Sequence, residues 1–190
     1  MSGNIHIILA SGSPRRRELV GGMGLRMTVA EKFSVEEVFP PDMPPEQVPQ
    51  YLAGVKSDAC PLPLGQGDVL LTADTVVILG GQILGKPRSR DEAIGMLARM
   101  QGREHVVVTG VVMRSATRRV AFSDTARVWF SALSTKEIEY YVDNYRPFDK
   151  AGAYGVQEWI GYVAIERIEG SFYTVMGLPT QKVYAALKEF

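Results

Sequence analysis

The chain has 190 residues, and its 21 Lys and Arg residues balance its 21 Asp and Glu residues, so its formal net charge is zero. The length and a hydrophobic content of 46% predict one domain over residues 1–190 with an ample core, and the single cysteine, Cys60, excludes an internal disulfide and a multi-cysteine zinc site. A neutral chain has no global attraction for nucleic acid or for an anionic membrane, so we expect neither as a partner.

The first residues, 1–10, have no basic run ahead of their apolar residues, and the apolar run is too short for a signal peptide or a membrane span. We therefore expect a cytoplasmic protein. The β-branched run from Asn4 to Ala10 predicts a strand. A loop follows at 11–13, and Pro14 suits the first turn of a helix through Val20.

Prolines crowd residues 40–49, which predicts an irregular surface connection. A helical period returns from Pro49 to Ala59 and places Lys56 near the end of that helix. Val69 to Thr72 then reads as a buried strand that enters Ala73-Asp74-Thr75, which places Asp74 at the end of an apolar strand.

Val76 to Leu79 predicts a hairpin that turns at Gly80-Gly81 into residues 82–84. Two capping boxes, Ser89 with Glu92 and Ser134 with Glu137, open helices that end at about Gly102 and Asn144. The β-branched runs 106–113 and 120–130 lie between these helices and predict an antiparallel pair.

The last third predicts a strand over Tyr162–Ile168, a loop over Gly170–Pro179 and a terminal helix. Helices and strands therefore interleave along the chain, and the fold class is α/β. The two histidines, His6 and His105, lie in β-like runs without metal-ligand spacing, so we interpret them as satisfied structural residues.

The segment 11–17, Ser-Gly-Ser-Pro-Arg-Arg-Arg, places hydroxyls, the amides of a helix start and guanidinium groups together after a strand. This chemistry suits phosphate, because helix N-terminal amides carry partial positive charge and arginine offers a planar fork of donors. A capped helix with solvated arginines explains the same residues. The local pattern leaves both interpretations open.

Gly80, Gly85 and Lys86 match the spacing of a nucleotide-binding P-loop, but Pro87 stands where that loop needs a hydroxyl, so we reject a P-loop. Lys86 projects from a constrained turn and is either a phosphate ligand or a solvated lysine.

Three acids, Glu36, Glu37 and Asp74, fit a magnesium site that also uses substrate phosphates. Asp74 is flanked by apolar residues and would be costly to bury without a partner.

Six separated motifs together resemble one family, the Maf proteins, which are nucleoside triphosphate pyrophosphatases. The motifs are LASGSPRRREL, TADTVV, GKPRSRDEAIGML, GREHVVVTGV, DKAGAYGVQ and GSFYTVMGLP. The resemblance implies a mixed central sheet with flanking helices, in two lobes around a nucleotide-binding cleft as in Maf and ITPase proteins. It also implies a divalent metal cation, Mg²⁺ or Mn²⁺, a nucleoside triphosphate substrate and a homodimer as a possible assembly.

Carried over by position, the resemblance makes Asp74 the base that activates water and Glu37 its metal partner, with Glu36 as the alternative. It implies a substrate-binding set of Ser11, Ser13, Arg15, Arg16, Lys56, Thr75, Lys86 and Gln157. Arg15, Thr75 and Gln157 match the subgroup that acts on dTTP and UTP. The chain departs from the family at Glu158-Trp159, where smaller residues are usual.

Two other functions stay open at this point. One is a 7-methyl-GTP pyrophosphatase of the same family, and the other is a non-catalytic nucleotide-binding regulator of septum formation. The family resemblance also implies that the enzyme hydrolyses non-standard nucleotides and so keeps them out of nucleic acid. It further implies a link between the protein and the arrest of cell division. The sequence leaves open whether Asp149 and Lys150 form a structural ion pair or line the site.

Overall fold

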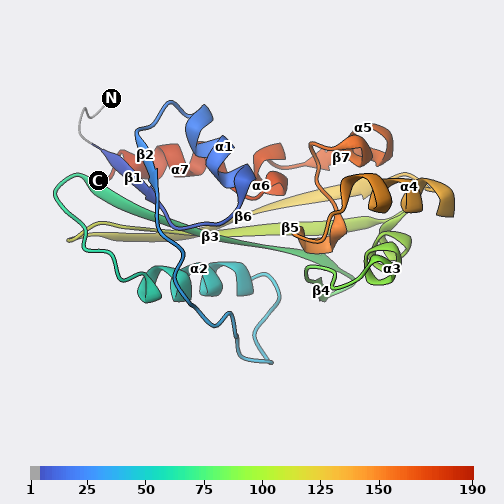
Figure 1. Ribbon diagram of the computed structural model, residues 1–190, viewed down its shortest axis with the longest axis horizontal. Helices are drawn as coiled ribbons and strands as arrows, with labels where there is room; N and C mark the ends of the chain where they lie inside the picture. Colours follow the sequence, from blue (N-terminus) through green and yellow to red (C-terminus); the bar gives the residue numbers. More distant parts are fainter. Residues whose placement is uncertain (1–4) are drawn as a thin grey trace. The chain divides into compact units, whose positions relative to one another are not determined.

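The computed structural model describes residues 5–190 and shows strands and helices alternating along the chain (Figure 1). The strands are β1 (His6–Leu9), β2 (Met27–Val29), β3 (Asp68–Leu79), β4 (Gln82–Leu84), β5 (Glu104–Arg114), β6 (Arg119–Phe130) and β7 (Ile165–Glu169). The helices are α1 (Pro14–Gly22), α2 (Val48–Ala59), α3 (Arg90–Met100), α4 (Thr135–Tyr145), the 3₁₀ turn η1 (Ala151–Ala153), α5 (Trp159–Ala164), α6 (Phe172–Met176) and α7 (Thr180–Leu187).

The strands form one seven-stranded sheet in the order β2-β1-β3-β5-β6-β7, with β4 paired to β3. Strand β1 runs parallel to both β2 and β3, whereas β4 is antiparallel to β3 and β7 is antiparallel to β6. The sheet is therefore mixed, and helices flank it. The α/β class with a mixed central sheet and flanking helices is confirmed.

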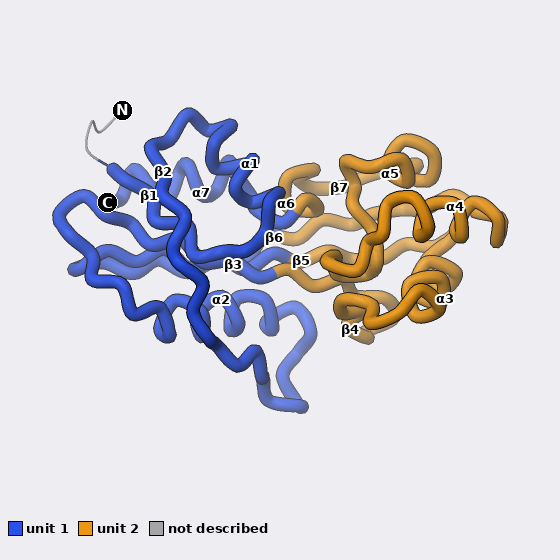
Figure 2. Tube along the Cα trace, viewed as in Figure 1, with its two compact units in different colours: residues 1–74, 109–124, 177–190 blue, residues 75–108, 125–176 orange. Residues whose placement is uncertain are grey.

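The chain divides into two compact units, drawn in blue and orange in Figure 2. Unit 1 contains the chain up to Asp74, together with Thr109–Asp124 and Gly177–Phe190, and unit 2 contains Thr75–Val108 and Thr125–Met176. The division falls within β3, β5 and β6, so each of these long strands contributes residues to both units.

In unit 1, α1 and α7 lie on one side of the strands and α2 lies on the other (Figure 1). Thr72 fixes α2 against the sheet, because its buried hydroxyl donates to the carbonyl of Ala53 at 2.8 Å. Gly110 allows the close approach of β5 to the start of the same helix. A Cβ added there would lie 2.1 Å from the backbone nitrogen of Gln50.

The expected helix starts and the first hairpin are confirmed. Ser13 caps α1, and its hydroxyl accepts from the backbone N–H of Arg16. Ser134 and Glu137 form a complete capping box on α4. At α3 the Ser89 hydroxyl caps as expected, but the Glu92 carboxylate accepts from the N–H of Arg88 instead of Ser89.

Three expectations about the elements are wrong. Asp74 lies in the middle of the twelve-residue β3 instead of at a strand end. Residues 162–164, expected as strand, end helix α5, and the expected loop 170–179 contains α6. A short apolar run cannot by itself distinguish a buried strand from a helix. Here the helix depends on Gly161, since a Cβ at this position would lie 1.8 Å from the carbonyl oxygen of Val156.

The two histidines have different surroundings. His6 is satisfied at both ring nitrogens, by Asp68 at 2.9 Å and Thr28 at 2.8 Å. His105 is buried, and its Nε2 pairs with the hydroxyl of Tyr154 at 2.8 Å, but its Nδ1 has no hydrogen-bond partner within residues 5–190. The expectation of a fully satisfied histidine is therefore wrong for His105. Cys60 is free and buried against Ile8, as expected of a core residue.

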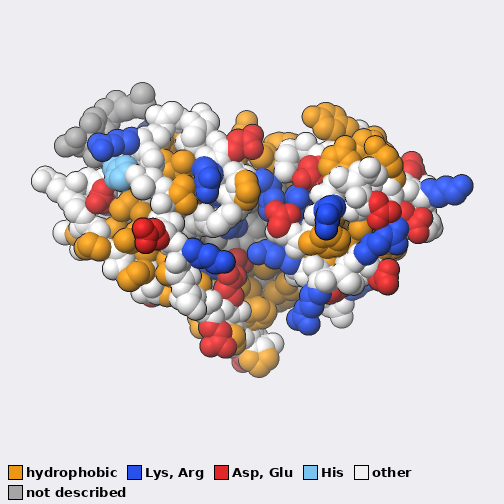
Figure 3. Space-filling view, viewed as in Figure 1, with side chains coloured by type: hydrophobic (Ala, Val, Ile, Leu, Met, Phe, Trp, Pro, Cys, Tyr) orange, Lys and Arg blue, Asp and Glu red, His pale blue; other side chains and the backbone are white. Residues whose placement is uncertain are grey.

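The surface carries charges of both signs. On the face drawn in Figure 3, acidic and basic side chains are interspersed with apolar and neutral ones. Within the described part of the chain, no helix combines the length and the apolar character needed to cross a membrane.

Candidate functional site

The first group of polar side chains in unit 1 lies at the start of α1. The hydroxyl of Ser11 accepts from the backbone N–H of Ser13 at 3.2 Å and from Nη1 of Arg16 at 3.4 Å. Nε of Arg16 donates to the carbonyl of Gly177 at 2.8 Å. The guanidinium of Arg16 is thus held at the N-terminal end of α1, where the helix dipole favours an anion.

A second group of unit 1 consists of one lysine and two carboxylates. Lys56 comes from the last turn of α2, and its Nζ lies 2.6 Å from Oδ1 of Asp74 and 2.9 Å from Oε2 of Glu37. The side chains of Lys56 and Asp74 are only 13% and 14% exposed, whereas that of Glu37 is 48% exposed. Two acids therefore converge on one cationic position, and one of them is almost fully enclosed.

The fold explains this convergence. Thr72 and Asp74 are two residues apart on β3 and so project from the same face of the strand. Thr72 binds the carbonyl of Ala53 on α2, and Lys56 follows Ala53 by about one helical turn, so it meets Asp74. Glu37 reaches Lys56 from the irregular segment before α2.

Electrostatics connect Arg16 to these acids. Burial lowers the pKa of Arg16 below its ordinary value, while the negative charge of Asp74 acts in the opposite direction. The charge of Arg15 also lowers this pKa, and that of Glu37 raises it. The guanidinium of Arg16 is thus close enough to Asp74 and Glu37 for their charges to affect its pKa. Unit 1 therefore places this basic group near the two acids.

The donor set of unit 1 fits a hard divalent cation. Each carboxylate uses one oxygen for Lys56, which leaves the second oxygen of Asp74 and of Glu37 outside that ion pair. Magnesium is commonly held by one or two carboxylates together with substrate phosphates and water. No cluster of three or more His, Cys, Asp or Glu side chains suited to a metal occurs among residues 5–190.

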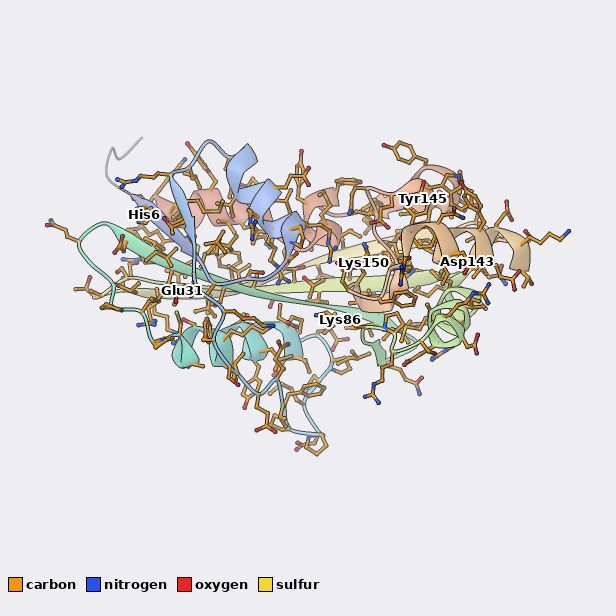
Figure 4. The ribbon with its side chains drawn as sticks, in the orientation of Figure 1. His6, Glu31, Lys86, Asp143, Tyr145 and Lys150 are labelled. Carbon is orange, nitrogen blue, oxygen red and sulfur yellow. The ribbon has the colours of Figure 1, made fainter. Side chains whose placement is uncertain are left out.

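Unit 2 contains the other expected substrate residues. Lys86, labelled in Figure 4, is exposed in the loop after β4. The carbonyl of Gly85 accepts from the N–H of Gly152 at 3.0 Å, which ties this loop to η1. Thr75 is half-buried in β3, next to Asp74 in the chain. Gln157 lies in the turn before α5, and its Oε1 is a buried atom without a hydrogen-bond partner in the described chain.

The structure therefore sorts the residues expected from sequence into two groups. In unit 1 it brings together Ser11, Ser13, Arg16, Glu37, Lys56 and Asp74, and Arg15 acts on Arg16 through its charge. In unit 2 it places Thr75, Lys86 and Gln157. Both neighbouring glutamates are exposed, and Glu37 is the one that contacts Lys56.

Sequence reasoning missed the contact that orients Arg16 and the contact of Lys150 with Glu158, although it raised an ion pair of Asp149 with Lys150 as one alternative. The carbonyl of Gly177 orients Arg16, although the two are 161 positions apart in the chain. Lys150 is only 7% exposed and binds both Asp149 at 2.8 Å and Glu158 at 3.0 Å. The second contact makes Lys150 part of a larger buried network, and only the motif DKAGAYGVQ signalled it.

Comparisons with known proteins agree on one family. The profile of the family described as "Maf-like protein" matches residues 6–190. A protein of Bacteroides thetaiotaomicron named dTTP/UTP pyrophosphatase is 47% identical over 192 residues and is covered completely, as is this chain. A protein of the same name from Porphyromonas gingivalis is 50% identical, with 97% of this chain and 94% of that protein covered.

A third relative with this name, from Flavobacterium psychrophilum, is 44% identical, with 97% of this chain and 94% of that protein covered. Among solved structures, a HAM1 protein from Coxiella burnetii matches with a TM-score of 0.48 and 12% identity. That match covers 98% of this chain and all of the HAM1 chain.

Proposed function

This chain belongs to the family of Maf-like proteins, and we propose that it is a nucleoside triphosphate pyrophosphatase that acts on dTTP and UTP. The reaction cleaves the bond between the α- and β-phosphates and yields the nucleoside monophosphate and pyrophosphate. The observation that carries the proposal is the convergence of Asp74 and Glu37 on Lys56, beside the guanidinium of Arg16. Full-length relatives named dTTP/UTP pyrophosphatase support the substrate assignment.

Asp74 is the base in this proposal. Its enclosed position on β3 holds one carboxylate oxygen against Lys56, and the second oxygen is directed to a proton of the attacking water. Because Lys56 also contacts Glu37, the ammonium fixes both acids at once. Asp74→Asn preserves the shape of the side chain and removes the base, so this variant stays folded and loses turnover.

The residues that would hold a divalent cation are Asp74 and Glu37, together with substrate phosphates. When bound, Mg²⁺ or Mn²⁺ would neutralise phosphate charge and lower the pKa of a coordinated water. The carboxylate oxygens of Asp74 and Glu37 are the ligands that such hard ions prefer.

The basic and hydroxyl residues bind the triphosphate in this proposal. Ser11, Ser13, Arg16, Lys56 and Lys86 supply donors for phosphate oxygens. The positive charges of Arg16, Lys56 and Lys86 offset the charge that develops on the leaving pyrophosphate. Positioning and electrostatic stabilisation dominate phosphoryl chemistry, so loss of any one of these groups lowers turnover more than it lowers stability.

Three further residues select the base in this proposal. Arg15, Thr75 and Gln157 offer donors and acceptors for the edge of a pyrimidine. A polar group that is left without a partner penalises the wrong base, which gives selectivity. The cytoplasm is the compartment we propose, since it holds the nucleotide pool and the only cysteine, Cys60, is a free thiol.

Pyrophosphate release by the purified protein tests the function. The panel contains dTTP, UTP, CTP and 7-methyl-GTP, each with Mg²⁺, with Mn²⁺ and with chelator. We expect metal-dependent release that favours dTTP and UTP. Preference for 7-methyl-GTP would overturn the substrate assignment, and binding of nucleotides without turnover would overturn the enzyme assignment. Ser134→Ala, which alters only the exposed cap of α4, is the matched control.

A further inference from the structure

Glu158 occupies the N-cap position of α5, yet its side chain makes no capping hydrogen bond. The carboxylate is directed into unit 2 instead. Oε1 lies 3.0 Å from Nζ of Lys150, and Oε2 accepts a hydrogen bond from the hydroxyl of Tyr141. Helix caps are made by the shorter side chains of Ser, Thr, Asp and Asn, and glutamate is not one of these residues. The carboxylate of Glu158 therefore serves its contacts inside unit 2 and not the cap of α5.

The partners of Glu158 are among the most enclosed polar groups of unit 2. Tyr141 is fully buried in α4, and Lys150 is almost fully buried just before η1. Burial raises the pKa of Tyr141, and the hydrogen bond to Glu158 raises it further, so the phenol stays protonated and donates. The hydroxyl of Tyr141 in turn accepts from the backbone N–H of Gly155 at 3.0 Å.

These contacts tie the two ends of the segment 150–158 to each other, through Lys150 and Glu158, and tie Gly155 and Glu158 to Tyr141 of α4. Lys150 precedes the segment's 3₁₀ turn, Gly155 lies in its middle and Glu158 ends it. The backbone N–H of Glu158 also donates to the carbonyl of Gly155 at 3.0 Å, which closes a turn. Gln157 lies inside that turn, so the orientation of its side chain depends on this network.

Packing couples Gln157 to Glu158 directly. A Cβ added at Gly155 would lie 2.9 Å from Cδ of Glu158 and 3.1 Å from Nε2 of Gln157. Both side chains therefore lie against the same glycine, and the place of Glu158 limits the space that the amide of Gln157 has there. Oε1 of Gln157 remains buried without a partner among the described residues, a costly state that a donor from a ligand would relieve.

We propose that Glu158, held by Lys150 and Tyr141, is a positioning residue that presents Oε1 of Gln157 to the imide N3–H of uracil or thymine. The inference rests on the proposed function and adds the chemical basis of its selectivity. Uracil and thymine carry a hydrogen at N3, whereas cytosine has an acceptor there. In the cytosine complex Oε1 and N3 are both acceptors, so Gln157 disfavours CTP and dCTP as long as Glu158 keeps the amide from turning Nε2 toward the base.

Glu158→Gln tests this role, because it keeps the shape of the side chain and removes the charge that binds Lys150. We expect the ratio of kcat/KM for UTP over CTP to fall roughly tenfold, the size of one hydrogen bond. In a protein that already carries Gln157→Ala, the same change leaves the ratio unaltered, since Glu158 acts through Gln157. Tyr141→Phe removes the other contact of Glu158, lowers the ratio in the same direction and serves if Glu158→Gln does not fold.

The matched control is Asp143→Asn on α4. Asp143 is labelled in Figure 4 and forms an exposed ion pair with Arg90 at 2.6 Å, so its loss leaves the UTP to CTP ratio unchanged. Equal losses for UTP and CTP in Glu158→Gln would overturn the positioning role. So would a further fall of the ratio in the protein that lacks Gln157.

A wild-type protein without turnover would refute the proposed function but would not end the test of Glu158. The same variants are then compared in equilibrium binding of UTP and CTP. A ratio of the two dissociation constants that Glu158→Gln leaves unchanged would overturn the inference.

Discussion

Lys56→Met removes the ammonium that two carboxylates share and keeps most of the volume of the side chain. Asp74, which is 14% exposed, would lose its ion-pair partner, and Glu37, which is 48% exposed, would face Asp74 without an intervening cation. Removing one partner of a fully buried pair costs about 3–5 kcal/mol, and exposed pairs contribute about 0–1 kcal/mol. The enclosed Asp74 lies nearer the first case, so we expect the free energy of unfolding to fall by about 2–3 kcal/mol.

Urea denaturation measures this loss, and thermal unfolding checks it. For a chain of this size, about 1 kcal/mol shifts the midpoint by roughly 2–4 °C, so Lys56→Met should lower Tm by about 4–12 °C. The double variant with Asp74→Asn removes the uncompensated charge as well. The free energy of unfolding that the double variant loses should therefore be smaller, by about 1–2 kcal/mol, than the sum of the losses in Lys56→Met and Asp74→Asn.

Glu37→Gln supplies the comparison. The carboxylate of Glu37 is half exposed, so we expect Glu37→Gln to lower the free energy of unfolding by less than about 1 kcal/mol. We expect its rate of pyrophosphate release to fall as strongly as that of Lys56→Met. Additive losses in Lys56→Met and Asp74→Asn, within about 0.5 kcal/mol, would refute the reasoning. They would show that the 2.6 Å contact carries no net coupling.

Three further changes test the fold. Burial lowers the pKa of His105 from 6.5 to about 4, so the unfolded chain takes up a proton first as the pH falls. The wild-type protein should therefore lose about 3 kcal/mol of stability between pH 6.5 and 4, and equal losses in His105→Gln would contradict this. Gly110→Ala should cost about 3 kcal/mol in urea unfolding, because the added carbon meets the backbone of Gln50; an unchanged midpoint would refute the close approach. Ser134→Ala should cost about 1 kcal/mol through its cap and leave kcat unaltered, and a loss of turnover would argue against a purely structural role.

Elements whose signals are local could be predicted from the sequence. Ser13 before Pro14 marks the start of α1, and Ser134 with Glu137 marks that of α4, because a cap is made by residues within one turn of each other. The turn at Gly80-Gly81 is local in the same sense, and both glycines have a positive φ.

Elements that depend on distant contacts could not be predicted in this way. The run Tyr162–Ile168 predicts a strand, yet residues 162–164 end helix α5 and only the rest lies in β7. The helix requires Gly161, where a Cβ would lie 1.8 Å from the carbonyl oxygen of Val156, and nothing in the local pattern reports that approach. The apolar run Val69–Thr72 places Asp74 at a strand end, whereas β3 continues through it. An acid inside a buried strand is costly without a partner, and the local pattern does not show that Lys56 supplies one.

The residues of the candidate site also differ in whether the local sequence identifies them. Residue types and spacing singled out Ser11, Arg16 and Asp74, since each suits phosphate or metal chemistry where it stands. The choice between Glu36 and Glu37 stayed open because both lie in an irregular segment, without a period that assigns one to a face. Only the contact of Glu37 with Lys56 distinguishes them.

The core and the chemistry of unit 1 share one strand. Thr72 and Asp74 project from the same face of β3, and Thr72 is bound to the carbonyl of Ala53 on the helix that carries Lys56. The packing that buries Thr72 therefore sets the distance between Lys56 and Asp74. Glu37 has no such support from regular structure and is far more exposed. One carboxylate is thus fixed by the core while the other is held by few contacts, a division that suits a cation whose ligands change as substrate phosphates arrive and leave.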